Sequence, residues 1–539
     1  MTDWRRALVV ALPAALALAL TLHGLAARSI WIDESASVTI ASQHGHALWA
    51  GIAHDGGNML VYYLVLHVLV GAFGDSELVV RLPSALATAA SAGLVSLLAL
   101  RLFSARAALA AGLLGAVSLP LVFWGQNARS YASMVAFVVA SYLAFLALVG
   151  DRGDVDDRGH RRWPWIAYVL TTVLGCYMSF VTVLVVPAQL VALAVTRPGR
   201  RTLRSVGTAL GVAACACVPL ALLATRRGSG QLFWVVRPNA TGLDQLANYL
   251  ASSAVLPNFH PTATSDALLV LSGVLVVAAG ALGLARRGTF PRSAAPAGAS
   301  GPGSIAGSFE PASRARWAYV LVVSWLVVPV ALDLVESFVG PSTFVPRNLL
   351  MCVPAVAVLL GAALTDGRVP RPLGWSVLAV LLVLRGLQVA PSYGVSPENW
   401  RAATRDVLAH TEKGDCIAFY PSDGRMAFDY YLGHTRADMA RAPRPVLPRA
   451  PFDEVRAYVE DYASLDARDL ARTVRSCRRL WLVTSHSGEP NGTAASRANF
   501  ERFRTLVAAA QHDYASWHVT SFGWASPVRV ELLARHRVA

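Results

Sequence analysis

Long runs of apolar residues, separated by short polar connections, constrain this chain more than any other feature. They recur through roughly the first 390 residues, and several approach the length of about 20 residues that a helix needs to cross a bilayer. Only 15% of the residues are charged, 55% are hydrophobic, and the mean hydropathy is +0.47. So little polar surface cannot cover a protein of this size in water. The sequence therefore predicts an all-α polytopic membrane protein.

About a dozen segments are candidate spans, which predicts about 11 to 13 transmembrane helices. The first candidate follows Arg5 and Arg6 and has no small-residue cleavage site before a soluble chain, so we interpret it as a retained helix rather than a signal peptide. The candidates lie near residues 7–27, 58–73, 78–100, 107–124, 132–149, 163–180, 181–196, 205–225, 264–285, 317–335, 346–364 and 373–390.

The formal net charge of +14 is distributed as expected for a membrane protein. Arginines gather in short connections between apolar runs, for example in 101–106, 197–204 and 286–316, which is the positive-inside pattern and argues against a nucleic-acid partner. Lys413 is the only lysine among many arginines, a usage typical of a GC-rich bacterial genome. We therefore expect a multi-pass protein of the bacterial cytoplasmic (inner) membrane.

The same charge rule predicts an orientation. It places the N-terminus and the basic connections inside, and the loop 29–58, the turn 126–131 and the C-terminal tail outside. One conflict remains, because an outer first loop and an inner turn near Arg101 require an odd number of crossings, whereas 58–73 and 78–100 resemble two. Either one of these segments does not cross completely, or the basic turn departs from the rule.

The chain changes character at about residue 391, where charged residues return and apolar runs shorten. Residues 416–420 and 480–484 have the pattern of short buried strands, and 400–410 and 500–510 have helical periodicity. The sequence thus predicts a transmembrane catalytic module at 1–390 and a small soluble extracytoplasmic α/β domain at 391–539.

Two cysteines, Cys416 and Cys477, lie in this tail beside predicted strands. Outside a bacterial inner membrane they are compatible either with a disulfide or with two buried thiols. The cysteine spacings do not resemble a zinc site.

Asp33 and Glu34 are adjacent carboxylates that follow the first span directly. An ionised carboxylate within a span costs about 2.5 to 3.5 kcal/mol, so a pair at this boundary is either solvated among headgroups or used in function. Position alone is equally compatible with Asp33 as an N-cap that opens an amphipathic segment through Val38 and Ile40.

Several short segments with a recognisable order follow these carboxylates. They are His54-Asp55-Gly56-Gly57-Asn58, Phe73-Gly74-Asp75-Ser76-Glu77, Arg81-Leu82-Pro83-Ser84-Ala85, Arg101-Leu102-Phe103 and Gln126-Asn127-Ala128-Arg129-Ser130-Tyr131. In content and order they resemble bacterial polyprenyl-phosphate-dependent glycosyltransferases of the GT-C fold, in the branch of family 39, the protein O-mannosyltransferases and the aminoarabinose transferases. The resemblance covers about residues 1–150 and thins beyond them to Arg347 and to Asn399-Trp400-Arg401. The chain departs from the family at 58–61, where relatives usually have prolines.

This resemblance implies inverting transfer of one sugar from a polyprenyl-phosphate donor to a cell-envelope glycan, lipid or protein at the outer membrane face, with mannose or arabinose favoured. Such transfer needs a base for the acceptor hydroxyl and cations for the departing phosphate. Asp33 matches the family's first-loop catalytic aspartate, and we predict that it is the general base, with Glu34 orienting the acceptor or sharing its proton. We predict that Arg129 and Arg347 bind the phosphate.

Other predicted substrate-binding residues come from the same outer connections. Gln126 and Tyr131 are expected in the sugar or phosphate site, and His54, Asp55 and Asn58 near sugar hydroxyls. His54 and Asp55 are also compatible with a divalent metal ion, although two residues make a poor metal site and we assign no metal ligands.

Two other classes of protein share parts of this pattern. A transporter or lipid flippase fits the composition, but transporters commonly show internal repeats and ionisable residues near mid-membrane, whereas this sequence shows no repeat and its charges lie at the outer rim. A non-catalytic scaffold would not need Asp33 and Glu34. We therefore favour the enzyme.

Overall fold

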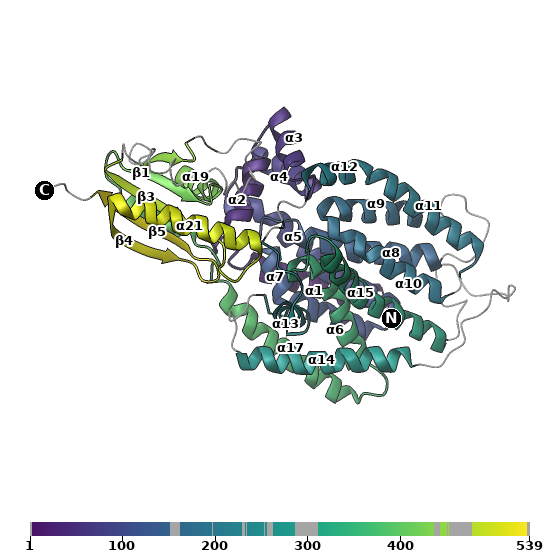
Figure 1. The fold of residues 1–539 in the computed structure, drawn as a ribbon. Helices are drawn as coiled ribbons and strands as arrows, with labels where there is room; N and C mark the ends of the chain where they lie inside the picture. The colour runs from purple at the N-terminus through teal and green to yellow at the C-terminus, as the bar shows by residue number, and fades with distance from the viewer. Residues whose placement is uncertain are drawn as a thin grey trace.

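The computed structural model describes residues 3–150, 162–196, 198–228, 232, 234–252, 254–255, 262–285, 311–435, 442–449, 451 and 477–535. A large helical part is followed by a smaller domain built on a β-sheet, and the N-terminus lies on the side of the helical part that faces away from the sheet (Figure 1). The fold is thus mostly helical, as the composition predicts.

The first half of the helical part contains both long and short helices. Short helices α2 and α3 follow the first long helix and lie beside the sheet domain (Figure 1). The helices are α1 (Asp3–Leu22), α2 (Ile32–Ala41), α3 (Gly45–His54), α4 (Leu60–Phe73), α5 (Glu77–Leu102), α6 (Ala105–Ala116), α7 (Leu119–Gly125), α8 (Tyr131–Gly150), α9 (Arg162–Met178), the 3₁₀ helix η1 (Phe180–Leu184) and α10 (Val185–Val195).

The second half ends with α17, two residues beyond the predicted domain boundary at 390. Its helices are α11 (Arg200–Ala216), α12 (Val218–Arg227), α13 (Ala240–Ala247), η3 (Asn248–Ser252), α14 (Thr262–Leu284), α15 (Pro311–Val339), η5 (Pro346–Cys352), α16 (Val353–Leu364) and α17 (Arg371–Ser392).

Among the described residues, seven helices are long and apolar enough to cross a membrane, and nine spans result if each of two bent pairs counts once. The bent pairs are α6 with α7, at 56°, and α11 with α12, at 46°. A helix coincides with each candidate span. The sequence predicted 11 to 13 because it counted α4 and the η1–α10 segment, which are apolar but shorter than 18 residues, and α9, which has 17 residues. At 1.5 Å per residue, α4 is about 21 Å long against about 30 Å of hydrocarbon, which favours the interpretation that 58–73 does not cross completely.

The C-terminal domain contains a five-stranded mixed sheet in the order β2-β1-β3-β5-β4. Strands β1 (Cys416–Tyr420), β2 (Arg444–Leu447) and β3 (Arg479–Thr484) are parallel, whereas β5 (Val528–Arg535) pairs antiparallel with β3 and with β4 (Tyr514–Phe522). The predicted strands at 416–420 and 480–484 and the predicted helix at 400–410 are confirmed, and the helix predicted at 500–510 is part of a longer one. An α/β domain is therefore present, as predicted.

The two faces of this sheet pack against different partners, because side chains alternate along each strand. Ile417 and Phe419 of β1 face α18 (Trp400–His410) and α19 (Gly424–His434), in a core that is continuous with that of the helical part. Cys416 and Ala418 face the opposite side, with Leu506 of α21 (Ala494–Asp513). The helices α18 and α19 therefore lie between the sheet and the helical part, and α19 packs on α2 (Figure 1).

A disulfide joins Cys416 to Cys477, with the two Cα atoms 5.9 Å apart. Of the two alternatives that the sequence left open, the structure contains the disulfide. It connects β1 to the residue that precedes β3 by two positions.

Candidate active site

Asp33 lies in the first turn of α2 and is accompanied by two arginines from distant parts of the chain. The guanidinium group of Arg347, in η5, lies 3.5 Å from Asp33 Oδ2, and Arg129 donates to the backbone oxygen of Asp33 at 3.3 Å. The Asp33 and Arg347 side chains are 17% and 25% exposed, so solvent or substrate can reach both. Three of the residues that the sequence singled out are thus brought together.

Tyr131 and Trp234 extend this group through Arg347. The Arg347 guanidinium carbon lies 5.0 Å from the ring centre of Trp234 and 6.0 Å from that of Tyr131. Stacking on aromatic faces orients a guanidinium group, so the two rings help to fix the position of Arg347.

Glu34 has a different environment from that of its neighbour. It is fully buried and accepts hydrogen bonds from Arg81 Nε at 2.8 Å, from Arg81 Nη2 at 2.7 Å and from the Ala128 amide at 2.7 Å. Arg81, buried in α5, also donates to the backbone oxygens of Leu25, Arg28 and Ser29. Both oxygens of Glu34 are therefore used to fix the start of α2 against the 126–131 turn, which favours a positioning role for this residue.

Gln126 is also occupied within the protein. Its amide nitrogen donates to the backbone oxygens of Thr21 and His23, and its side-chain oxygen accepts from Arg28. Gln126 is 1% exposed, so its contacts join the end of α1 to the turn.

His54, Asp55 and Asn58 occupy the connection between α3 and α4. The buried Asp55 accepts a hydrogen bond from Tyr63 at 2.8 Å, and Asn58 accepts one from the Phe180 amide at 3.4 Å. These bonds tie the connection to α4 and η1.

The C-terminal domain supplies residues next to Asp33 that sequence reasoning missed. Glu398 is 1% exposed, accepts from the backbone amide of Ile32 at 3.2 Å and pairs with His486 Nε2 at 2.6 Å. His486 follows β3 and Asp423 follows β1, so both lie at the carboxyl edge of the parallel strands. This edge is a common location for ligand sites in α/β sheets.

Electrostatic interactions shift the pKa values of Asp423 and His486. Burial raises the pKa of Asp423 to about 7, and the carboxylates of Glu398 and Asp33 contribute to the increase, whereas His486 opposes it. Desolvation lowers the pKa of His486, but Glu398, Asp423 and Asp33 together raise it to about 9. Asp33 is therefore within electrostatic range of both residues, and His486 is cationic at neutral pH.

Further contacts fasten the loop before α2 to the C-terminal domain. Arg401 donates to the backbone oxygens of Ala26, Ala27 and Arg28, and the Tyr431 hydroxyl accepts from the Ile30 amide at 2.6 Å. Both side chains also contact Glu77. The orientation of Asp33 thus depends on both parts of the chain.

Some of the missed residues carried a sequence signal. An arginine inside an apolar span is costly unless it is paired, so Arg81 could have been recognised as the partner of an acidic residue. Glu398 directly precedes the Asn399-Trp400-Arg401 segment. His486 and Asp423 follow strands but belong to no motif.

Within the described residues, the one group of three His and Asp side chains placed closely enough to hold a metal ion lies in the C-terminal domain, not at Asp33. It consists of Asp406, His410 and His518.

Residues 58–223 match the family model described as "Dolichyl-phosphate-mannose-protein mannosyltransferase". A search of curated proteins found no match. The chain is similar in structure to ArnT from Cupriavidus metallidurans in the apo state, with a TM-score of 0.58 and 16% identity over 96% of this chain and 97% of that one. ArnT from the same organism bound to undecaprenyl phosphate is similar with a TM-score of 0.55 and 14% identity, over 98% of this chain and 98% of that one.

A third solved structure is the archaeal oligosaccharyltransferase AglB from Archaeoglobus fulgidus, in complex with an inhibitory peptide and a dolichol-phosphate. Its TM-score is 0.53 and its identity 11%, over 99% of this chain and 74% of that one. These structural similarities establish the fold.

The chain thus has the fold of ArnT, and the match to the mannosyltransferase family named above covers about a third of its length. Both findings favour the glycosyltransferase interpretation of the sequence over a transporter or lipid flippase.

Proposed function

We propose that this protein is a membrane glycosyltransferase that transfers one mannose, or alternatively one arabinose, from a polyprenyl-phosphate donor to a cell-envelope glycan, lipid or protein. The observation that carries the proposal is the partly exposed Asp33, which lies 3.5 Å from Arg347 and is held through its backbone by Arg129. The family description names a dolichyl-phosphate-mannose donor, which supports mannose as the first choice.

Asp33 is the general base of this proposal. It takes the proton of the acceptor hydroxyl while the hydroxyl oxygen bonds to the anomeric carbon and the bond from that carbon to the phosphate oxygen breaks. The configuration inverts, and the polyprenyl phosphate leaves with the electron pair. The Asp33 side chain is partly exposed beside Arg347, so the hydroxyl of an acceptor can reach its carboxylate.

Arg347 and Arg129 stabilise the phosphate as its negative charge grows. A guanidinium group can donate two parallel hydrogen bonds to a phosphate, and it works best in a site that excludes bulk water. Arg129 is only 6% exposed, and Arg347 is oriented by Trp234 and Tyr131. We therefore assign Arg347 the closer contact and Arg129 a supporting one.

Glu34 acts through Arg81 rather than on the acceptor, because both of its oxygens are used inside the protein. Gln126 similarly positions the turn. His54 and Asn58 remain predicted contacts for sugar hydroxyls, with Asp55 holding their loop.

The acceptor approaches from the C-terminal domain in this proposal. His486 and Asp423 lie on that side of Asp33, and a cationic imidazole there suits an acceptor with anionic groups, as cell-envelope polymers and lipids often have. In this proposal the reaction, the sheet domain and the acceptor lie on the outer face of a bacterial cytoplasmic membrane, as the distribution of basic residues predicts.

The test is transfer of radiolabelled sugar by the purified enzyme in nanodiscs, with polyprenyl-phosphate mannose and polyprenyl-phosphate arabinose in separate reactions and cell-envelope extract as acceptor. Asp33→Asn removes the base without changing its size. Asp366→Asn, in the turn at the end of α16 opposite to η5 and Arg347, is the matched control. We expect transfer from mannose donor by the wild type and the control but not by Asp33→Asn.

Equal transfer by Asp33→Asn would remove Asp33 as the base. Transfer from the arabinose donor alone would show that the sugar is arabinose rather than mannose, and it would leave the assigned roles of the site residues unchanged. No transfer from either donor would contradict the proposed donor class.

A further inference from the structure

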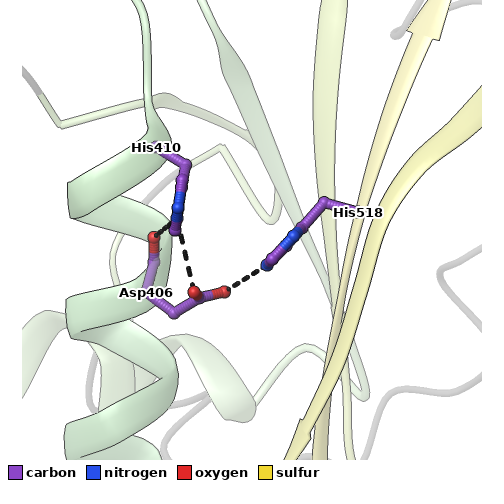
Figure 2. Close-up of side chains that lie close together, drawn as sticks. All are labelled: Asp406, His410 and His518. Atoms are coloured by element: carbon purple, nitrogen blue, oxygen red, sulfur yellow. Dashed lines mark hydrogen bonds and ion pairs between the residues drawn. The ribbon is translucent and has the colours of Figure 1, made fainter.

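Asp406, His410 and His518 form a group on the C-terminal domain that the proposed reaction does not use (Figure 2). Asp406 and His410 are one turn apart on α18, and His518 comes from β4 across from that helix. Asp406 Oδ1 lies 3.3 Å from His410 Nδ1, and Asp406 Oδ2 lies 2.9 Å from His518 Nε2. One carboxylate is thus shared by two imidazoles.

The spacing of these atoms suits a transition-metal ion. Each residue offers one ligand atom, and the three atoms lie within 4.8 Å of one another. With zinc–ligand distances of about 2.0 to 2.1 Å, a tetrahedral site separates its ligand atoms by about 3.3 Å. The separations between the three ligand atoms therefore differ from those of a tetrahedral zinc site by at most about 1.5 Å.

The surroundings hold the side chains in place. His410 Nδ1 lies 2.9 Å from the backbone oxygen of Asp406, His518 Nε2 lies 3.0 Å from Thr520 Oγ1, and the His518 ring packs edge-on to Trp481 at 6.2 Å. The two hydrogen bonds use the same ring nitrogens that face Asp406, so a bound ion would replace them, whereas the packing of His518 against Trp481 would remain. The nearby Arg479 is paired with Glu412 and Asp415, so its positive charge is already compensated.

The position is also accessible. His410 is 54% and His518 33% exposed, whereas Asp406 is 15% exposed. An ion can enter from solvent, and a water molecule can occupy the fourth position. Two imidazoles and one carboxylate form a donor set of the type that zinc accepts.

We propose that Asp406, His410 and His518 bind one divalent transition-metal ion, zinc in particular, and that this ion fastens α18 to the edge strand β4. Helix α18 begins at Trp400, next to Arg401 and Glu398, which contact the loop and helix that carry Asp33. The ion therefore stabilises the platform behind the candidate active site. It takes no part in sugar transfer, and the proposal stands independently of the reaction assigned above.

The test uses the full-length enzyme in detergent, stripped of metal with a chelator and then titrated with zinc chloride against a chromophoric competitor. The variants are His410→Gln and His518→Gln, which keep a side chain able to hydrogen-bond to Asp406. The matched control is His434→Gln, because His434 pairs with a single carboxylate, Asp75, at 3.1 Å and is not part of the group.

We expect one zinc ion per wild-type or control chain, with affinity at least about tenfold weaker in both test variants. Zinc should raise the melting temperature of the wild type and the control but not of the test variants. Absence of saturable binding to the wild type, or equal binding by His410→Gln and His518→Gln, would overturn the proposal.

A second measurement covers the case of variants that fail to fold. Cobalt substitution of the wild-type enzyme is expected to give the intense visible absorption of a tetrahedral site with nitrogen and oxygen ligands. A weak octahedral spectrum in the protein that binds cobalt would contradict the proposed site.

Discussion

The adjacent carboxylates Asp33 and Glu34 give a sharp prediction, because substitution of each should affect a different property. Glu34→Gln removes a charge that is buried beside Arg81, with side-chain exposures of 0% and 1%. In the wild type one oxygen accepts from both Arg81 Nε and the Ala128 amide, and the other accepts from Arg81 Nη2. An amide can replace only one of these oxygens, so its NH₂ group must face an N–H donor of Arg81.

The cost of this change follows from the burial of the pair. Breaking a buried ion pair on one side costs about 3 to 5 kcal/mol, because the remaining charge is left uncompensated. Asp33 and Arg347 are partly exposed and 3.5 Å apart, so loss of their charge attraction costs only about 0 to 1 kcal/mol. Glu34→Gln should therefore lower the free energy of unfolding severalfold more than Asp33→Asn.

The assay compares apparent melting temperatures of the two variants and the wild type in the same nanodiscs, alongside sugar transfer measured well below the lowest melting temperature. We expect Asp33→Asn to melt with the wild type and to be inactive, and Glu34→Gln to melt several degrees lower. A Glu34→Gln enzyme with the melting temperature of the wild type but no sugar transfer would refute the positioning role. It would indicate that Glu34 takes part directly in the reaction.

Three further predictions concern the leaving group, the docking of the C-terminal domain and the disulfide. Arg347→Ala should lower kcat by roughly 100-fold or more, which is the usual effect of removing one hydrogen-bond donor to the transition state, and Arg347→Lys should have an intermediate kcat. A change in KM alone would contradict contact of Arg347 with the transition state. The pKa of His486 is raised from about 6.5 in the unfolded chain to about 9 in the folded protein. The protonated imidazole therefore stabilises the fold fully below about pH 6.5, and this contribution is lost as the pH rises through about 9. Melting temperatures measured across this range should decline in the wild type and decline less in His486→Gln. Replacing Cys416 and Cys477 with serine removes a disulfide that joins residues 61 positions apart, and it should lower the free energy of unfolding by about 4 kcal/mol. The melting temperature of the variant should fall; a reducing agent should lower that of the wild type equally and should not lower that of the variant further. An unchanged melting temperature would contradict this prediction.

Local patterns predicted much of the fold. The strand at 416–420 and the helix at 400–410 have the predicted bounds, and each predicted span coincides with a helix. These features depend on residues that are neighbours in the chain, and the hydrophobic period records them directly. The number of crossings was less accessible for two reasons. Some apolar segments, such as α4 and η1–α10, are shorter than a membrane crossing, and bends between α6 and α7 and between α11 and α12 interrupt apolar runs that are continuous in the sequence.

The candidate site, too, could be predicted from the sequence only in part. The resemblance identified Asp33, Arg129 and Arg347, which the structure brings together, but it could not separate the surroundings of Asp33 from those of Glu34. That difference depends on Arg81, 47 positions away. The contact of Glu398 with Ile32 spans 366 positions and exists only because the C-terminal domain docks on α2, which no local pattern encodes.

The most direct test of the central claim is a structure of the Asp33→Asn enzyme with polyprenyl-phosphate mannose, since a variant without its base should hold the donor intact. We predict that the phosphate contacts Arg347 and Arg129 and that the anomeric carbon faces Asn at position 33. A donor phosphate bound away from both arginines would contradict the account.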